Sequence, residues 1–185
     1  MNLKEYFKLK GEIQVRLKDK DGNPKKLWSE NWLGKLIRTK LGIDWQGNFI
    51  LGHWTETLKI INLVVNAGKA EVAGLINEVT IGGFKWIAIG TGTAAAAVTD
   101  TALGAEITTG GGARGAAACT RVTTVVTNDT AQLVVTWNLT ATFAVTESGC
   151  FDAASAGNML CRQVFSAQNV VSGDSLEYTW KVSVA

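Results

Sequence analysis

The sequence has a single histidine, His53, and this scarcity excludes several kinds of catalytic and metal site. A metal centre built from several histidines is impossible, and a Ser-His-Asp or Cys-His arrangement would have to be built on this one residue. His53 lies in the segment LGHWTE, and the chain has no G-x-S-x-G motif. We therefore expect a packed or surface histidine, and a protein that is not an enzyme.

Cysteine is also scarce, since Cys119, Cys150 and Cys161 form an odd set without a C-x-x-C pair. This pattern argues against a zinc site and against the disulfide framework of a small secreted domain. Buried free thiols are the expected state. Cys150 and Cys161 would form a bridge only if neighbouring strands aligned them, which the sequence leaves open.

No apolar run is long enough to cross a bilayer, and the first residues, MNLKEYFKLKGE, lack the apolar core of a signal peptide. The expectation is a protein made and kept in the cytosol, or released only by lysis, without a membrane partner. The net charge is only +2, although residues 1–40 hold eleven Lys and Arg against five Asp and Glu. These cations are scattered rather than clustered, so a nucleic-acid partner is not expected. Docking onto an acidic protein surface explains them equally well, and a solvated face explains them best.

Glycine is abundant, and the segment IAIGTGTAAAAVTD places Gly90 and Gly92 after a strand-like run, as phosphate-binding loops do. A P-loop would need a lysine followed by Ser or Thr, and a dinucleotide-binding turn would need a third glycine at position 95. This chain has Ala95 there and no lysine within reach. A strand that ends in a turn is the better interpretation, and no cofactor is expected.

Two acidic segments resemble metal or catalytic sites but fail on spacing. The segment DKDGN, from Asp19, begins like a calcium loop, but Trp28 stands where a bidentate glutamate is needed, so a hairpin turn is expected. In TESGCFD, Glu147 and Asp152 are five residues apart around a glycine, which is not a glycosidase signature. We expect Glu147 to bind turn amides and Asp152 to cap a loop. No metal ligand and no catalytic residue is predicted.

Apolar residues alternate with polar ones in the last third of the chain, over residues 131–143 and 175–184. Such strands have one buried and one wet face, which is typical of antiparallel sheets. Several strands at this spacing favour a mainly β fold: an antiparallel, jelly-roll-like β-sandwich with a small α/β amino-terminal region. The apolar face of these strands contains Leu133, Val135, Trp137, Leu139, Ala141, Phe143, Leu176, Tyr178, Trp180, Val182 and Val184.

The chain is predicted to divide into residues 1–83 and residues 84–185. The first part holds a hairpin and two short helices, one from Trp32 to Leu41 that Gly42 ends, and one that Asn66 caps. The apolar face of the second helix would be Val72, Leu75, Ile76 and Val79. The second part holds the sandwich and an extended arm over residues 91–118. Because the arm has little apolar area, we expect a neighbouring copy to order it, with Arg114 near an acidic partner.

Four of the seven tryptophans, Trp28, Trp32, Trp45 and Trp54, lie early in the chain. Core packing is the common fate of a tryptophan, but tryptophan is also enriched among the anchors of protein interfaces. These four residues and Arg114 are therefore the candidate interface residues. Exposed tryptophans surrounded by polar side chains would instead favour a carbohydrate site.

The segments FKWIAIGTGTAAAAVTDTALGAEI, CTRVTTVV and TATFAVTESGCFDAASAGNMLCRQVFSAQNVVSGDSLEYTWKVSV occur in this order between Phe84 and Val184. Together they resemble a pattern found in structural proteins of tailed bacteriophages. In that pattern a strand ends in GTGT, a DTAL segment follows, and E-x-G-x-F-D and a last strand of the form GD-x-L-x-x-x-W close it. The chain departs from the pattern in the inserted TTGGGARGAAAC segment and in Cys150 and Cys161.

The resemblance implies a virion component assembled in the host cytoplasm, and no catalytic residue is carried over from it. A capsid decoration protein is the preferred interpretation, because the chain is short and has no coiled coil or repeats. Its expected partners are the major capsid protein or other virion proteins, together with further copies of itself, for instance as a trimer. The alternative is a tail or fibre module that binds a receptor or a carbohydrate.

Overall fold

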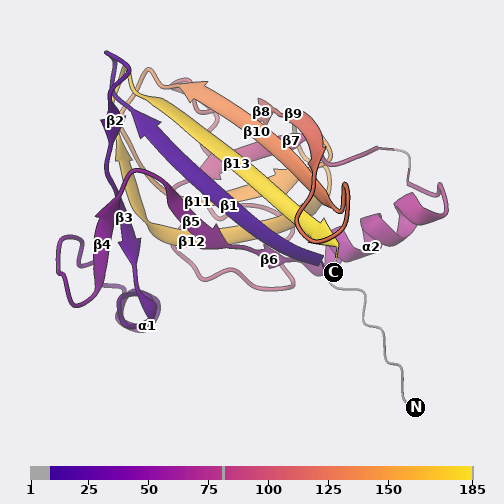
Figure 1. Cartoon of the computed structure of the whole chain (residues 1–185), viewed down its shortest axis with the longest axis horizontal. Coiled ribbons are helices and arrows are strands. Elements are labelled where there is room, and N and C mark those ends of the chain that lie inside the picture. The colour runs from indigo at the N-terminus through magenta and orange to yellow at the C-terminus, as the bar shows by residue number, and fades with distance from the viewer. Residues whose placement is uncertain (1–8, 81, 185) are drawn as a thin grey trace.

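The computed structural model describes residues 9–80 and 82–184. Two antiparallel sheets pack face to face as a β-sandwich, while two short helices and a small third sheet lie at its ends (Figure 1). The expected mainly β fold is confirmed; the jelly-roll connectivity stays a prediction. No helix in the described ranges is long and apolar enough to span a membrane.

The first sheet has the strand order β2–β1–β13–β10–β9, and β5 also pairs with β1. The central pair is β1 with β13, which are antiparallel over ten residues, from Leu9 opposite Val184 to Lys18 opposite Ser175. Strands from before residue 84 therefore belong to the sandwich itself. The bounds are β1 (Leu9–Lys18), β2 (Pro24–Lys25), β5 (Leu58–Ile61), β9 (Ala118–Val122), β10 (Thr130–Asn138) and β13 (Ser175–Val184).

The second sheet has the order β6–β12–β11–β7–β8, and a separate two-stranded sheet pairs β3 with β4. Strands β11 and β12 place Cys150 directly opposite Cys161. Both are buried free thiols, so the alignment that a bridge would need is present although the bridge is not. The bounds are β3 (Leu27–Glu30), β4 (Gly52–Thr55), β6 (Leu63–Val64), β7 (Trp86–Gly90), β8 (Gly115–Ala116), β11 (Phe143–Phe151) and β12 (Met159–Val170).

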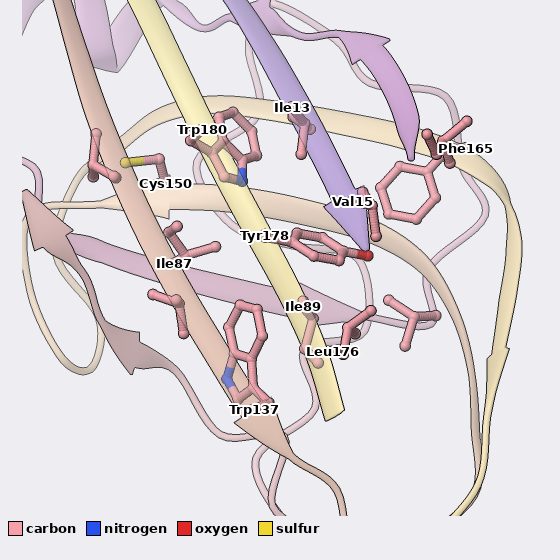
Figure 2. Packing of buried hydrophobic residues seen from close by; sticks show 14 of the residues in the cluster. Ile13, Val15, Ile87, Ile89, Trp137, Cys150, Phe165, Leu176, Tyr178 and Trp180 are labelled. Carbon is pink, nitrogen blue, oxygen red and sulfur yellow. The ribbon is translucent and has the colours of Figure 1, made fainter. Parts of the chain in front are cut away.

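The core lies between the two sheets, where the alternating residues of β10 and β13 meet those of β7, β11 and β12 (Figure 2). Trp137, Tyr178 and Trp180 are buried there, as the alternation predicts. The rings of Trp137 and Tyr178 pack edge to face with centroids 5.5 Å apart. One detail of the prediction is wrong: β10 ends at Asn138, because the amides of Leu139 and Thr140 bond to Asp174 and Gly110 instead of a neighbouring strand.

Helix α1 (Trp32–Leu41) begins and ends where the sequence predicts. The side chain of Asn31 accepts hydrogen bonds from the amides of Leu33 and Gly34, which satisfies two of the free donors at the helix start. Gly42 ends the helix in the left-handed conformation, with φ 69°.

Helix α2 (Asn66–Ile76) corrects the predicted cap and face. Val65 occupies the cap position and makes no side-chain bond, while Ile76 and Val79 are exposed. Of the predicted face, Val72 does pack against the core. The helix also packs through Gly68, where an added Cβ would lie 2.3 Å from the carbonyl oxygen of Leu160.

One edge of β12 is covered by side chains where β6 no longer pairs with it. Asp44 accepts a hydrogen bond from the amide of Ala167 at 3.0 Å, and Gln46 donates to the carbonyl of the same residue at 2.8 Å. The second carboxylate oxygen of Asp44 accepts from the hydroxyl of Ser166. The loop after α1 is thereby fixed to the sandwich.

Candidate docking surface

The glycine-rich turn after β7 is occupied by a carboxylate of the chain itself. Glu147, on β11, is fully buried and accepts hydrogen bonds from the amides of Gly92, Ala105 and Gly104 at 2.9, 2.7 and 3.0 Å. A Cβ at Gly92 would lie 2.3 Å from Oε1 of Glu147, so only glycine allows this approach. The prediction that Glu147 binds turn amides is confirmed. Asp152 likewise accepts from the amide of Asn158.

Arg162, on β12, completes this network. Its Nη2 donates to Oε2 of Glu147 and its Nη1 to Oδ2 of Asp100, each at 2.7 Å. The Arg162 side chain is only 4% exposed, so its charge is balanced inside the protein. The sequence does not single out this arginine, because nothing in the local sequence indicates a partner 62 residues away. The network therefore anchors the loop to the sheet and leaves no free acid or base.

The structure corrects the expectation that a neighbouring copy orders residues 91–118. The side chains of Leu103 and Ile107 are buried, and the short strand β8 pairs with β7. The amide of Ile107 also donates to the carbonyl of Ile89. The segment has little apolar area, as its composition indicates, but backbone amides bound to Glu147 and to β7 hold it on its own domain.

Arg114 is likewise engaged within its own chain. Its guanidinium pairs with Glu106 at 2.7 Å, donates to the carbonyls of Ala153 and Ala156, and lies 3.8 Å above the ring centre of Phe151. The acidic partner that the sequence suggests is therefore Glu106 of the same chain. With its side chain only 7% exposed, Arg114 has little surface left for a partner protein.

The early tryptophans behave differently from one another. Trp28 is buried and packs edge to face against Trp54, with ring centroids 5.3 Å apart. Trp32, Trp45 and Trp54 are exposed, Trp32 at 76% of its surface. Of the four, Trp28 supports Trp54 from beneath, and the other three face solvent.

These three tryptophans belong to a larger set of exposed apolar residues on α1, on the loop from α1 to β4, and on β4. Figure 1 shows α1, β3 and β4 gathered at one corner of the molecule, away from α2. Phe49, in the loop from α1 to β4, is 89% exposed. We call this set the aromatic surface; it consists of Trp32, Leu36, Leu41, Ile43, Trp45, Phe49, Ile50 and Trp54.

The backbone beneath the aromatic surface is fixed at several points. Asn31 donates from its side chain to the carbonyl of Ile50 at 2.7 Å, and its amide donates to Leu51 at 2.8 Å. At Gly34 the helix lies so close to the loop that an added Cβ would be 2.4 Å from the carbonyl oxygen of Leu51. The loop and the helix therefore form one packed unit.

The charges around the aromatic surface are mostly positive. Lys26, Lys35 and Lys40 are exposed and take part in no ion pair within residues 9–80 and 82–184. Arg38 is neutralised by Glu30 at 2.6 Å, with both side chains largely buried. Three lysines consequently border the surface, against two exposed carboxylates, Glu56 and Asp44, and the oxygens of Asp44 are already bonded to Ser166 and Ala167.

The remaining candidates contribute no chemistry to this corner. His53 is exposed on β4, where its backbone pairs with Ser29. Over the part of the chain that the structure describes, no group of three or more His, Cys, Asp or Glu side chains is placed to hold a metal ion. What the corner offers is apolar area and positive charge, which are properties of a binding surface.

Comparison with known proteins adds one finding. A family model described as podophage GP4 fiber I protein gp80 matches residues 68–181, which is more than half of the chain. The match runs from the first turns of α2 to β13 and includes the Glu147 network, whereas the aromatic surface lies wholly before it. No curated protein and no solved structure matches the chain.

Proposed function

The chain belongs to the podophage GP4 fiber I protein gp80 family, and we propose that it is a non-enzymatic fiber or decoration subunit on the surface of a phage particle. A structural role in a virion follows from the family. The observation that carries the finer proposal is the aromatic surface, which gives a compact sandwich a means of attachment.

Two positions on the particle fit a subunit of this size. The family description favours a fiber, in which this chain would be a short unit near the point of attachment. The capsid lattice is the other position, where the chain would be a decoration protein bound to the major capsid protein and to neighbouring copies. The absence of a coiled coil or repeat from the sequence favours a decoration or adaptor unit over a long shaft.

Gold-labelled antibody against the purified chain tests both positions on intact particles viewed by electron microscopy. Label spread over the head would support the decoration role, and label confined to fibers or the tail would support the fiber role. Mass spectrometry of purified particles gives the decisive control, because a chain absent from them is not a virion subunit.

A receptor- or carbohydrate-binding module is a second candidate, favoured by the exposure of Trp32, Trp45 and Trp54. Tryptophan rings can stack on sugars, but a sugar site also needs polar groups beside them. Here the neighbours include Leu41, Ile43 and Ile50, which suit a protein partner better. Binding of the purified chain to polysaccharide from host cells, lost in Trp32→Ala and Trp45→Ala, would support this second candidate instead.

A further inference from the structure

We infer that the aromatic surface docks onto an apolar site with an acidic rim on another protein of the particle. This inference rests on the proposed function and names the partner chemistry of that attachment. It goes beyond the family, because the matched region begins at residue 68, after the last residue of the aromatic surface.

The aromatic surface leaves an unusual amount of large apolar side chain exposed to water. Eight such residues lie within a segment of 23 residues, from Trp32 to Trp54, and three of them are tryptophans. Monomeric proteins rarely expose apolar groups together in this way, and tryptophan is prominent among residues that dominate binding energy. A partner that buries Trp32 and Phe49 would remove the two most exposed aromatic side chains of this set from water.

The charges select the type of partner. Lys35 and Lys40 lie on the exposed side of α1, together with Trp32 and Leu36. Two copies that met face to face through this surface would bring their lysines together, since a two-fold interface uses the same patch on both subunits. Like charges brought together oppose association, whereas carboxylates around an apolar site would attract the same lysines. The surface is therefore matched to an acidic partner and not to a second copy.

The surface is also ordered before it binds. Asn31 ties α1 to the loop, the Arg38–Glu30 pair fixes the helix, and Asp44 ties the loop to β12. Binding by a preformed surface avoids much of the entropy cost of ordering a flexible segment. Docking as a rigid unit is consistent with a permanent attachment point.

The test uses particles that lack this chain, produced with a stop codon in its gene, and the purified full-length chain added back to them. Bound chain is measured by co-sedimentation over a range of concentrations. We expect the double variant Trp32→Ala/Phe49→Ala to bind at least about 30-fold more weakly, as hot-spot residues do. The matched control, Val79→Ala/Val125→Ala, alters two similarly exposed apolar residues elsewhere and should stay within about twofold.

A second pair of variants tests the acidic rim. Lys35→Glu/Lys40→Glu should bind about tenfold more weakly at low salt, and the difference should shrink as salt screens the charges. The control is Lys20→Glu/Lys69→Glu, which reverses two exposed lysines away from the surface. Circular dichroism of every variant confirms that the sandwich is folded.

The outcomes separate the inference from the proposed function. Normal binding by the surface variants would overturn the inference, as would a wild-type dimer that Trp32→Ala/Phe49→Ala converts to monomer. Competition by host polysaccharide would overturn it in favour of a glycan. If mass spectrometry finds no copy of the chain in wild-type particles, the proposed function itself fails. If the chain is present and only the variants behave normally, the proposed function stands without the inference.

Discussion

Glu147 on β11 and Arg162 on β12 meet in a buried ion pair in which Nε and Nη2 of the arginine donate to the same oxygen, Oε2, at 2.9 and 2.7 Å. The carboxylate also accepts three backbone amides from the loop after β7, so one buried charge joins two strands and a loop. Every donor around it needs a negative, acceptor-only group in that place.

The variant Glu147→Gln should lower the free energy of unfolding by about 3–5 kcal/mol, as is usual when one partner of a buried pair is removed. The NH2 group of the glutamine would face either Arg162 and the amide of Gly104 or the amides of Gly92 and Ala105, and in both cases donor would oppose donor. Thermal unfolding followed by circular dichroism measures the effect. Glu177→Gln is the control, since its pair with Arg16 is long and solvent-exposed and should contribute less than about 1 kcal/mol. Equal melting temperatures for the two variants would contradict this account.

Tyr178→Phe should leave the stability unchanged or raise it by about 1 kcal/mol. The tyrosine hydroxyl is buried without a hydrogen-bond partner among the described residues, and burial raises its pKa strongly. Removing the hydroxyl therefore breaks no hydrogen bond and eliminates the cost of burying an unpaired polar group. Trp137→Phe offers the contrast, because Nε1 of Trp137 donates to the carbonyl of Ala113 at 2.7 Å. That variant should lose about 2 kcal/mol or more in chemical denaturation, and a clear loss for Tyr178→Phe would show that its hydroxyl is bonded in solution.

Asp129 should make part of the stability dependent on pH. Hydrogen bonds from the amides of Val126, Val125 and Thr124 hold the pKa of this carboxyl well below its usual range. A lowered pKa in the folded state stabilises the protein above the ordinary aspartate pKa of about 4, and this contribution is lost as the pH falls through the lowered value. The melting temperature of Asp129→Asn should lie below that of the wild type at pH 7 and approach it towards pH 2. Asp21→Asn, on an exposed turn, serves as the control, and a difference independent of pH would exclude this role.

One thiol per chain should react with a thiol reagent in the native protein, and three after unfolding. Cys119 is exposed, whereas Cys150 and Cys161 are buried, and burial raises the pKa of the Cys161 thiol well above its usual value. Only the thiolate reacts, so both buried groups should stay inert. Partial burial also raises the pKa of Cys119, which makes a reagent at about pH 8.5 suitable. In Cys119→Ser the native reaction should vanish, while a single reactive thiol in the unfolded wild type would reveal a Cys150–Cys161 bridge.

The sequence predicts the sandwich because its signals there are local. The alternation around Trp180 and the Gly42 boundary of α1 each depend on residues a few positions apart. The order of residues 91–118 depends instead on amides that reach Glu147 across more than 40 residues, and composition carries no sign of such bonds. An estimate based on apolar area alone therefore underestimates how well this segment is held.

At the candidate surface, too, the sequence predicts the features that depend on local residues and misses those that depend on distant ones. Tryptophan content indicates an interface, but the sequence cannot tell Trp28 from Trp32, since burial depends on the pairing of β3 with β4. The charge of Arg114 predicts an acidic partner at an interface, but the fold supplies Glu106, eight residues earlier in the same chain. The exposure of Leu41, Ile43 and Ile50 depends on the path of the loop in the folded chain, which the sequence pattern does not indicate.

The bonds from Asp44 and Gln46 to Ala167 have a consequence for the protein at high concentration. An open strand edge is a template onto which another chain can add, and repeated addition produces fibrils. Here a carboxylate and an amide use the donor and the acceptor of Ala167 that an incoming strand would need, so strand addition is opposed at this point of the β12 edge. A chain that accumulates before assembly therefore has one fewer place at which this sheet edge can polymerise.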